Sequence, residues 1–286
     1  MDNLPRRSFL QTAAALLPFA AATAKGTRHL TNIGVELYTV RNTITKDPAG
    51  VLNAIEQIGY NEAELVYATV DAIWPSLEKT KLKPVSAHID SSLFSDDSKL
   101  EATFEDVKKH SIQYVVYPYL PPPQRGGLAA IRKLADTLNN TGEKAKKLGL
   151  HLCYHNHAFE FEPMEGTTGF EELLKQTHKD LVSLELDVFW ASAAGHDPVT
   201  VLKQHGKRIA LVHLKDKSAD LPVHYNETVP KDAFKEVGKG SLDFAAILRT
   251  AWARGIRHYF VEQDQTPRDP IDSLNTRDSY VKALRF

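Results

Sequence analysis

The feature that most constrains the fold of this chain is an alternation, repeated eight times, between short apolar runs and helix-like segments. The short runs are rich in Val, Ile, Leu and Tyr, as expected of strands. The expected strands cover residues 33–38, 62–66, 83–88, 114–117, 150–155, 182–187, 209–213 and 258–262. The expected helices cover residues 48–58, 71–80, 100–110, 128–148, 170–177, 198–205, 242–254 and 270–284. Such alternation predicts an α/β fold with a parallel sheet.

Two architectures of parallel sheet compete, and the first strand separates them. Eight strand–helix units in 286 residues match the (β/α)8 barrel, which needs about 250 residues. An open, doubly wound sheet that binds a nucleotide needs a glycine-rich turn after its first strand. Residues 38–42 contain no glycine. The sequence therefore predicts a single (β/α)8 TIM barrel over residues 25–286, without an interdomain linker.

The composition excludes several classes of protein. Lys+Arg 35 against Asp+Glu 36 gives a net charge of -1, whereas nucleic-acid binding requires a clustered basic excess. Hydrophobic residues make up 42% and charged residues 25%, which is ordinary for a globular protein. The one cysteine, Cys153, cannot form an intrachain disulfide.

Residues 1–24 have the features of an export signal. Arg6 and Arg7 precede an uncharged segment that ends in the small residues Ala22-Thr23-Ala24. The paired arginines followed by Ser-Phe-Leu resemble a twin-arginine signal, which implies a periplasmic or extracellular protein exported in the folded state. Cleavage after Ala24 would remove two arginines and one aspartate, changing the net charge from -1 to -2. The apolar run is shorter than the roughly 20 residues of a membrane span, and no other segment qualifies. The competing interpretation is an ordinary frayed helix.

Polar residues gather where the predicted strands end, the edge at which barrel enzymes carry their chemistry. Four successive strands end in His155, Asp187, His213 and Glu262. These nitrogen and oxygen ligands suit Mn, Zn, Co or Fe. Taken singly, each of three residues also has a purely structural interpretation: His213 as a core histidine, Asp187 as a helix cap and Glu262 as a surface ion-pair partner. Their coincidence on adjacent strands favours a metal site.

Further side chains at the same edge are candidates for catalysis or for substrate binding. Glu185 lies two residues before Asp187 and so shares its face of the strand, as a group behind the ligands or as the partner of a buried cation. The candidate catalytic residues are Glu262, Glu160, Lys215 and His88. The candidate substrate-binding residues are Glu36, Tyr38, Glu64, His157 and Trp190.

Five motifs in this order resemble the xylose isomerase-like barrel superfamily, broadly the sugar phosphate isomerases/epimerases, over residues 30–284. They include Gly-Val-Glu-Leu-Tyr-Thr-Val-Arg at 34–41, Tyr-His-Asn-His-Ala-Phe-Glu-Phe at 154–161 and Glu-Leu-Asp-Val-Phe-Trp at 185–190. Val-His-Leu-Lys-Asp at 212–216 and Val-Glu-Gln-Asp at 261–264 complete the set. The motif at 154–161 points to an exported subgroup.

The resemblance implies one divalent metal (Mn, Zn, Co, Fe or Mg) held by Glu, Asp, His and Glu from strands five to eight. Asp187, His213 and Glu262 carry over, whereas His155 stands where the family has a glutamate. Glu160 is expected to supply the missing carboxylate, and His157 is a less favoured substitute ligand.

The implied activity is isomerisation or epimerisation of a sugar or keto-sugar by proton removal next to a carbonyl. A divalent ion would polarise the carbonyl while Glu262 and Glu160, on opposite sides, act as bases, with Lys215 and His88 stabilising the oxyanion or returning a proton. An exported location and the lack of a phosphate loop favour a non-phosphorylated substrate.

Several alternatives to this activity stay open. They are elimination from a 3-keto-sugar or 3-keto-glycoside, a non-catalytic sugar-binding protein, a structural partner of an oxidoreductase and an endonuclease IV-like phosphodiesterase, which the near-neutral charge disfavours. Homo-oligomerisation is also open.

Two long connections are expected to cover the mouth of the barrel. Residues 216–241 lack clear periodicity, and residues 118–127 contain three consecutive prolines. Because both follow strands, both should overhang the site and exclude water.

Overall fold

The computed structural model describes residues 28–286, apart from the side chains of residues 276–279. The signal segment expected over residues 1–24 and its cleavage after Ala24 lie outside the described residues. None of the helices described between residues 28 and 286 has the length and apolarity needed to cross a membrane.

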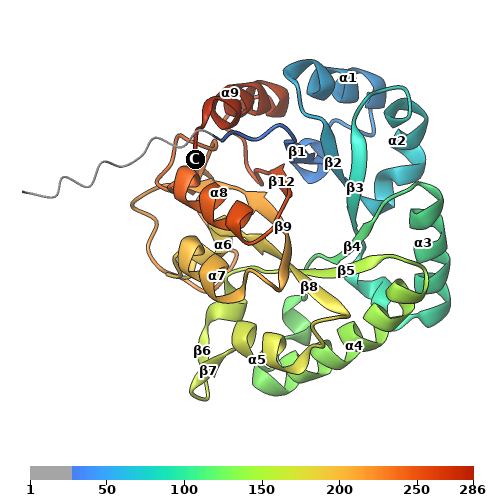
Figure 1. Ribbon diagram of the computed structural model, residues 1–286, viewed down its shortest axis with the longest axis vertical. Coiled ribbons are helices and arrows are strands. Elements are labelled where there is room, and N and C mark those ends of the chain that lie inside the picture. The colour runs from blue at the N-terminus through green and yellow to red at the C-terminus, as the bar shows by residue number, and fades with distance from the viewer. Residues whose placement is uncertain (1–27) are drawn as a thin grey trace, which may run out of the picture.

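Eight parallel strands close into a barrel, which confirms the predicted (β/α)8 architecture (Figure 1). In chain order the barrel strands are β1 (Gly34–Glu36), β2 (Glu62–Val66), β3 (Lys83–His88), β4 (Tyr114–Tyr117), β5 (His151–His155), β8 (Val182–Asp187), β9 (Ile209–Leu214) and β12 (His258–Val261). Each strand pairs with its neighbours in sequence, and β12 pairs with β1 to close the ring. Two small hairpins lie outside the barrel: β6 (Pro163–Met164) with β7 (Thr167–Thr168), and β10 (Asp216–Lys217) with β11 (Phe234–Lys235).

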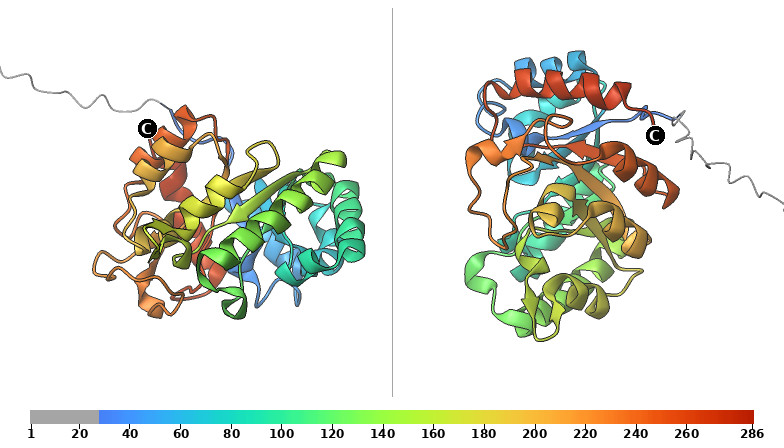
Figure 2. Two further views of the ribbon diagram at one scale, coloured as in Figure 1. Left: turned by 90° about the horizontal axis from the view of Figure 1, so that it is seen from below. Right: turned by 90° about the vertical axis from the view of Figure 1, so that its left-hand side faces the viewer.

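Helices surround the barrel on its outside (Figures 1 and 2). They are α1 (Pro48–Ile58), α2 (Val70–Leu77), α3 (Asp97–Lys109), α4 (Gly127–Lys147), α5 (Gly169–Gln176), α6 (Val188–Ala193), α7 (Pro198–His205), α8 (Phe244–Ala253) and α9 (Pro270–Ala283). Local chemistry explains their ends. In α1, the Asp47 side chain accepts a hydrogen bond from Gly50 N–H, Pro48 starts the helix, and Gly59 ends it with φ 113°.

The structure differs from the expected elements in two places that matter for the site. The first strand ends at Glu36 rather than at residue 38, because Leu37–Val40 forms a 3-10 turn whose cap Arg41 donates its backbone N–H to Tyr38 O. Tyr38 therefore lies on a turn and not in the strand. The short helix α6 was not expected, although its Asp187 N-cap is the local signal for it: the Asp187 side chain accepts from Trp190 N–H at 2.9 Å.

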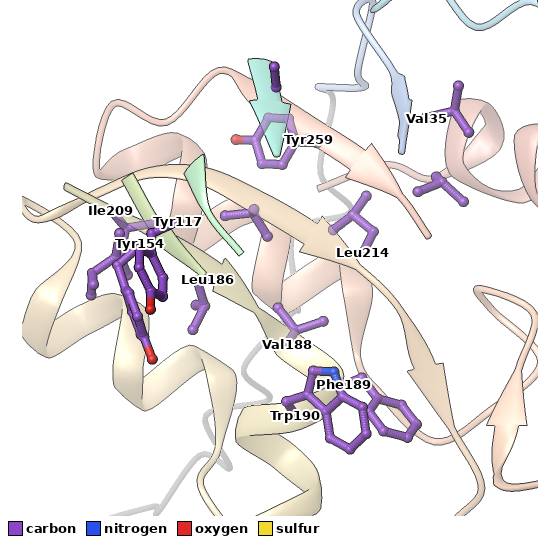
Figure 3. Packing of buried hydrophobic residues seen from close by; sticks show 14 of the residues in the cluster. Val35, Tyr117, Tyr154, Leu186, Val188, Phe189, Trp190, Ile209, Leu214 and Tyr259 are labelled. Carbon is purple, nitrogen blue, oxygen red and sulfur yellow. The ribbon is translucent and has the colours of Figure 1, made fainter. Parts of the chain in front are cut away.

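Two apolar clusters divide the core. The large one fills the space between barrel and helices; Figure 3 shows the Tyr117 and Tyr154 rings together within it, and their centroids lie 5.8 Å apart. The small one lies apart from it and consists of Val85, Val116, Cys153, Leu211 and Phe260. On β5, Cys153 belongs to the small cluster and Tyr154 to the large one, so alternation along the strand points His155 to the side of Cys153, inside the barrel. Polar side chains fill the rest of the interior, up to the carboxyl ends of the strands.

Candidate metal centre and active site

Four buried side chains from consecutive barrel strands converge at the mouth: His155 on β5, Asp187 on β8, His213 on β9 and Glu262 directly after β12. Each offers one ligand atom, and these atoms all lie within 4.8 Å of one another. Strand register creates this meeting, because Asp187 is paired with His213 across β8 and β9. The residues expected to hold a metal are therefore brought together.

The hydrogen bonds of His155 show that a cation fits between these side chains. Its Nδ1 lies 3.2 Å from the carbonyl oxygen of Pro118, an acceptor, so this nitrogen carries the proton. Its other ring nitrogen, Nε2, faces Asp187 Oδ2 at 3.5 Å. Within residues 28–286, His155 Nε2 has no hydrogen-bond partner, and Asp187 Oδ2 has none either, although the Lys215 ammonium lies 3.0 Å away as an ion-pair partner. A ring nitrogen and a carboxylate oxygen that face each other in this way can both be ligands of one metal ion.

His213 is held in the orientation of a metal ligand. Its Nε2 lies 2.5 Å from Glu64 Oε2, and the Ser86 hydroxyl donates to Glu64 Oε1 at 2.6 Å. Its Nδ1 faces Glu262 Oε2 at 2.8 Å. A carboxylate behind a ligating histidine sets its tautomer and raises its basicity. Glu64 takes this place behind His213, where its side chain is fully buried, so the structure assigns it to the support of His213 rather than to the mouth where contact with substrate was expected.

Lys215 supplies positive charge beside the ligands. Its Nζ lies 3.0 Å from Asp187 Oδ2 and 2.7 Å from Glu262 Oε2. Burial alone would lower the pKa of this ammonium, but Asp187, Asp264 and Glu262 outweigh burial and raise the pKa well above its usual value. Lys215 is therefore a permanent cation beside the candidate metal ligands.

Asp264 is a site residue that the sequence analysis did not select. Its Oδ2 lies 2.9 Å from Lys215 Nζ. Burial raises the pKa of this carboxyl to about 6, which is suited to taking up and releasing a proton near neutral pH. The available signal was its position two residues after Glu262, just beyond the end of β12.

Glu160 does not take the expected place on the other side of the metal ligands. Its Oε1 accepts a hydrogen bond from the Tyr154 hydroxyl at 2.6 Å, and Oε2 accepts from the backbone N–H of His157 at 2.9 Å. Tyr154 points away from the barrel interior, so the carboxyl is turned with it toward the helix layer. Burial raises the pKa of Glu160 to about 7. This residue shapes the turn that carries His157 and does not contact the ligands.

His157 and Trp190 form an aromatic wall beside the ligands. Their ring centroids lie 5.3 Å apart, and Tyr119 meets the His157 ring edge-on at 4.8 Å. Burial holds the pKa of His157 well below its usual range, so the ring is neutral. Within the described part of the chain, His157 Nδ1 and Trp190 Nε1 have no hydrogen-bond partner, which leaves one polar atom on each ring for a ligand.

Glu36 was expected to bind substrate and His88 to act in catalysis. In the structure they contact each other beside the metal ligands. His88 Nδ1 lies 3.2 Å from Glu36 Oε1, and His88 Nε2 lies 2.8 Å from Glu185 Oε2. Since both ring nitrogens face carboxylates, the geometry does not support direct contact of His88 with a substrate. Tyr38 is 40% exposed on its turn, with the Arg41 guanidinium stacked on its ring at 4.1 Å.

Comparison with known proteins identifies the family to which this barrel belongs. The sequence pattern of the xylose isomerase-like TIM barrel family matches residues 98–286. The chain belongs to that family. A solved sugar phosphate isomerase/epimerase from Parabacteroides distasonis has a TM-score of 0.73 and 24% identity, with 92% of this chain and 96% of that chain covered. The IOLI protein with a bound zinc atom has a TM-score of 0.69 and 20% identity, with 89% and 99% covered. At these identities, the two structures show the fold alone.

Among sequence relatives, an Inosose dehydratase 2 from Bacillus cereus is 32% identical over 152 residues, which is 49% of this chain and 50% of that protein. The chain thus spans about half the length of the sequence relatives it matches.

Two loops close over the mouth of this xylose isomerase-like barrel, both among those expected to do so. The right view of Figure 2 shows the loop between β9 and α8 (orange) running toward the loop before α4 (green). They are joined by a two-point ion pair, with Arg125 Nη2 2.9 Å from Glu227 Oε1 and Arg125 Nη1 donating to Glu227 Oε2 at 3.1 Å. The Arg125 guanidinium also stacks on Phe159 at 3.6 Å. We call this pair the latch.

Proposed function

We propose that this protein is a metal-dependent isomerase or epimerase that removes a proton next to the carbonyl of a sugar or keto-sugar. The observation that carries the proposal is the convergence of His155, Asp187, His213 and Glu262 on one point beside Lys215. The zinc of the IOLI structure supports a divalent ion at such a site, and its identity in this chain is open.

The chain's own residues divide the work around this point. When bound, a divalent cation acts as a Lewis acid that polarises a substrate carbonyl. Glu262 takes the proton from the adjacent carbon, and the Lys215 ammonium stabilises the negative charge that moves to the carbonyl oxygen. Asp264, with its pKa near 6, returns a proton in place of Glu160. The wall of His157 and Trp190 stacks against the sugar ring.

Elimination of water is the second candidate, and the inosose dehydratase relative favours it. The first step is the same removal of a proton next to the carbonyl. The electron pair then expels a β-hydroxyl, which leaves as water after protonation by Asp264, and the product is an unsaturated ketone. A non-phosphorylated 3-keto-sugar or 3-keto-glycoside carries the required groups.

One assay separates these reactions from simple binding. The protein is loaded with Mn²⁺ or Zn²⁺ and incubated in D₂O with a panel of keto-sugars and 3-keto-glycosides. Deuterium taken up by the product, detected by NMR, is expected for isomerisation or epimerisation, because a proton from solvent is returned to carbon. Elimination returns no proton to the carbon next to the carbonyl and is detected instead by the ultraviolet absorption of the unsaturated ketone. Asp187→Asn, which removes the negative charge of a metal ligand, is the control without turnover. A substrate that binds with neither signal would contradict both reactions and support a sugar-binding protein.

A further inference from the structure

A second group of potential ligands lies beside the first inside the barrel. Glu64, His88, Glu185 and His213 each offer one atom, and these atoms also lie within 4.8 Å of one another. His88 Nε2 is 2.8 Å from Glu185 Oε2 and 3.3 Å from Glu64 Oε2. Glu185 precedes Asp187 by two residues on β8, so it points to the same face about 6–7 Å deeper in the barrel. His213 belongs to both groups.

Five carboxylates that are at most 4% exposed surround the two groups: Glu36, Glu64, Glu185, Asp187 and Glu262. Lys215 lies against Asp187 and Glu262, and the His88 and His213 rings lie among the other carboxylates. A divalent cation between Glu64 and Glu185 would compensate carboxylate charge that otherwise depends on these two imidazole rings.

An unpaired oxygen shows where this charge belongs. Glu185 Oε1 is fully buried and has no hydrogen-bond partner among the described residues. His213 Nε2 lies 3.3 Å from this oxygen, but the same nitrogen is closer to Glu64 Oε2, at 2.5 Å. Glu185 Oε1 therefore points into the second group without a hydrogen-bond donor.

We propose that Glu64, His88 and Glu185 hold a second divalent cation beneath the first, with the His213 ring between the two ions. Two carboxylates and one imidazole suit Mn²⁺, Zn²⁺, Co²⁺ or Fe²⁺. His88 is the least buried member of this second group, with 11% of its side chain exposed, so a cation would enter the group past His88. The second ion neutralises the carboxylates below the mouth and does not contact substrate, so the proposal does not depend on the reaction catalysed.

The test is the number of metal ions bound by the whole protein. Metal-free protein is titrated with Mn²⁺, and bound metal is measured by mass spectrometry alongside electron paramagnetic resonance. We expect two equivalents and a spectrum broadened by coupling between neighbouring Mn²⁺ ions. Glu185→Gln and His88→Asn should each bind one equivalent, with the six-line spectrum of an isolated ion. Glu160→Gln changes a buried carboxyl outside both groups and should keep two.

The outcomes separate this proposal from the proposed function. One equivalent in the wild type, lost in Asp187→Asn and unchanged in Glu185→Gln, would overturn the second site and leave the catalytic metal in place. No bound metal at all would overturn both. The wild-type titration decides the question even if a variant fails to fold.

Discussion

At the scale of single residues, hydrogen bonding decides which of two neighbouring histidines can bind metal. His155 and His157 are two positions apart, yet it is His155 whose Nε2 faces Asp187 while its Nδ1 lies 3.2 Å from Pro118 O. His157 instead stacks on Trp190.

We expect His155→Ala to weaken metal binding at least about tenfold, since even changes behind the ligands cost 10–100-fold in affinity. His157→Ala should keep metal affinity and weaken sugar binding. Isothermal titration with Mn²⁺, and then with a keto-sugar, checks both. Equal losses of metal affinity in the two variants would contradict the assigned ligand.

In the proposed proton transfer, Glu262 removes the proton and Asp264 returns one. Isosteric variants of the two residues test these roles separately. Glu262→Gln should keep the fold and some metal but lose proton exchange by about 10²–10⁴, the usual cost of removing a general base. Asp264→Asn should lower turnover and remove the step in the pH–rate profile near pH 6. The deuterium assay over pH 5–8 measures both. Full exchange in both variants would place the proton with other groups.

The raised pKa of Glu160 makes the stability of the folded protein depend on pH. Burial raises its pKa from 4.5 to about 7, so the folded state holds this proton more tightly than the unfolded state. The stability it contributes is therefore complete below about pH 4.5 and is lost as pH rises through about 7, by at most about 1.4 kcal/mol per pH unit. Glu160→Gln should flatten this fall in urea unfolding at pH 5–8, whereas the exposed control Glu105→Gln should not. Parallel curves for wild type and Glu160→Gln would contradict the prediction.

At the scale of elements, the latch joins two loops that belong to distant parts of the chain. Arg125 lies before α4 and Glu227 lies between β9 and α8. The base of the second loop is anchored separately, since Asp216 accepts from the backbone N–H groups of Gly238 and Gly240, each at 2.9 Å. The tip of that loop is held by the latch together with a hydrogen bond from His224 N–H to Ala193 O at 3.1 Å.

Glu227→Gln should remove about 1–2 kcal/mol from the closed state and raise the open population about tenfold. We expect faster hydrogen exchange in residues 218–232, a raised KM and an unchanged melting temperature. Glu101→Gln, which breaks an exposed contact with Lys144 between α3 and α4, is the matched control. Unchanged exchange in the loop would show that the latch does not close it.

At the scale of the whole molecule, the buried carboxylates tie metal binding to stability. A cation held only by the folded state adds about 2.7 kcal/mol at a concentration 100 times its Kd, which raises the melting temperature of a protein of this size by roughly 5–10 °C. Chelation should reverse this rise, and Asp187→Asn should respond less than the wild type. Calorimetry with and without EDTA tests it. An unchanged melting temperature would indicate that no ion is bound.

Export is also a property of the whole chain. We propose that Arg6 and Arg7 direct the folded protein through twin-arginine export. Replacing both with Lys should retain the protein, with its leader attached, inside the cell, as fractionation and mass measurement would show. A single Asp2→Asn change is the control. Normal export of the double variant would contradict this route.

The sequence by itself determined the features that depend on neighbours along the chain. Asp47, Pro48 and Gly59 set the ends of α1 because capping involves residues only a few positions apart. Eight strand–helix units predicted the barrel, and a parallel barrel brings every strand's carboxyl end to one mouth. That geometric necessity is why the order of residues alone was enough to expect Asp187, His213 and Glu262 to meet.

Only the tertiary structure decided which polar side chains face one another. The Tyr154 hydroxyl turns Glu160 away from the ligands, and Arg125 meets Glu227 across 102 positions of chain. Strand register brings Glu64, His88 and Glu185 from three strands together beneath the mouth. Residue type and spacing specify the face of a strand but not the depth of a side chain or its partner across the barrel. Those depend on how strands and loops from distant parts of the chain pack together.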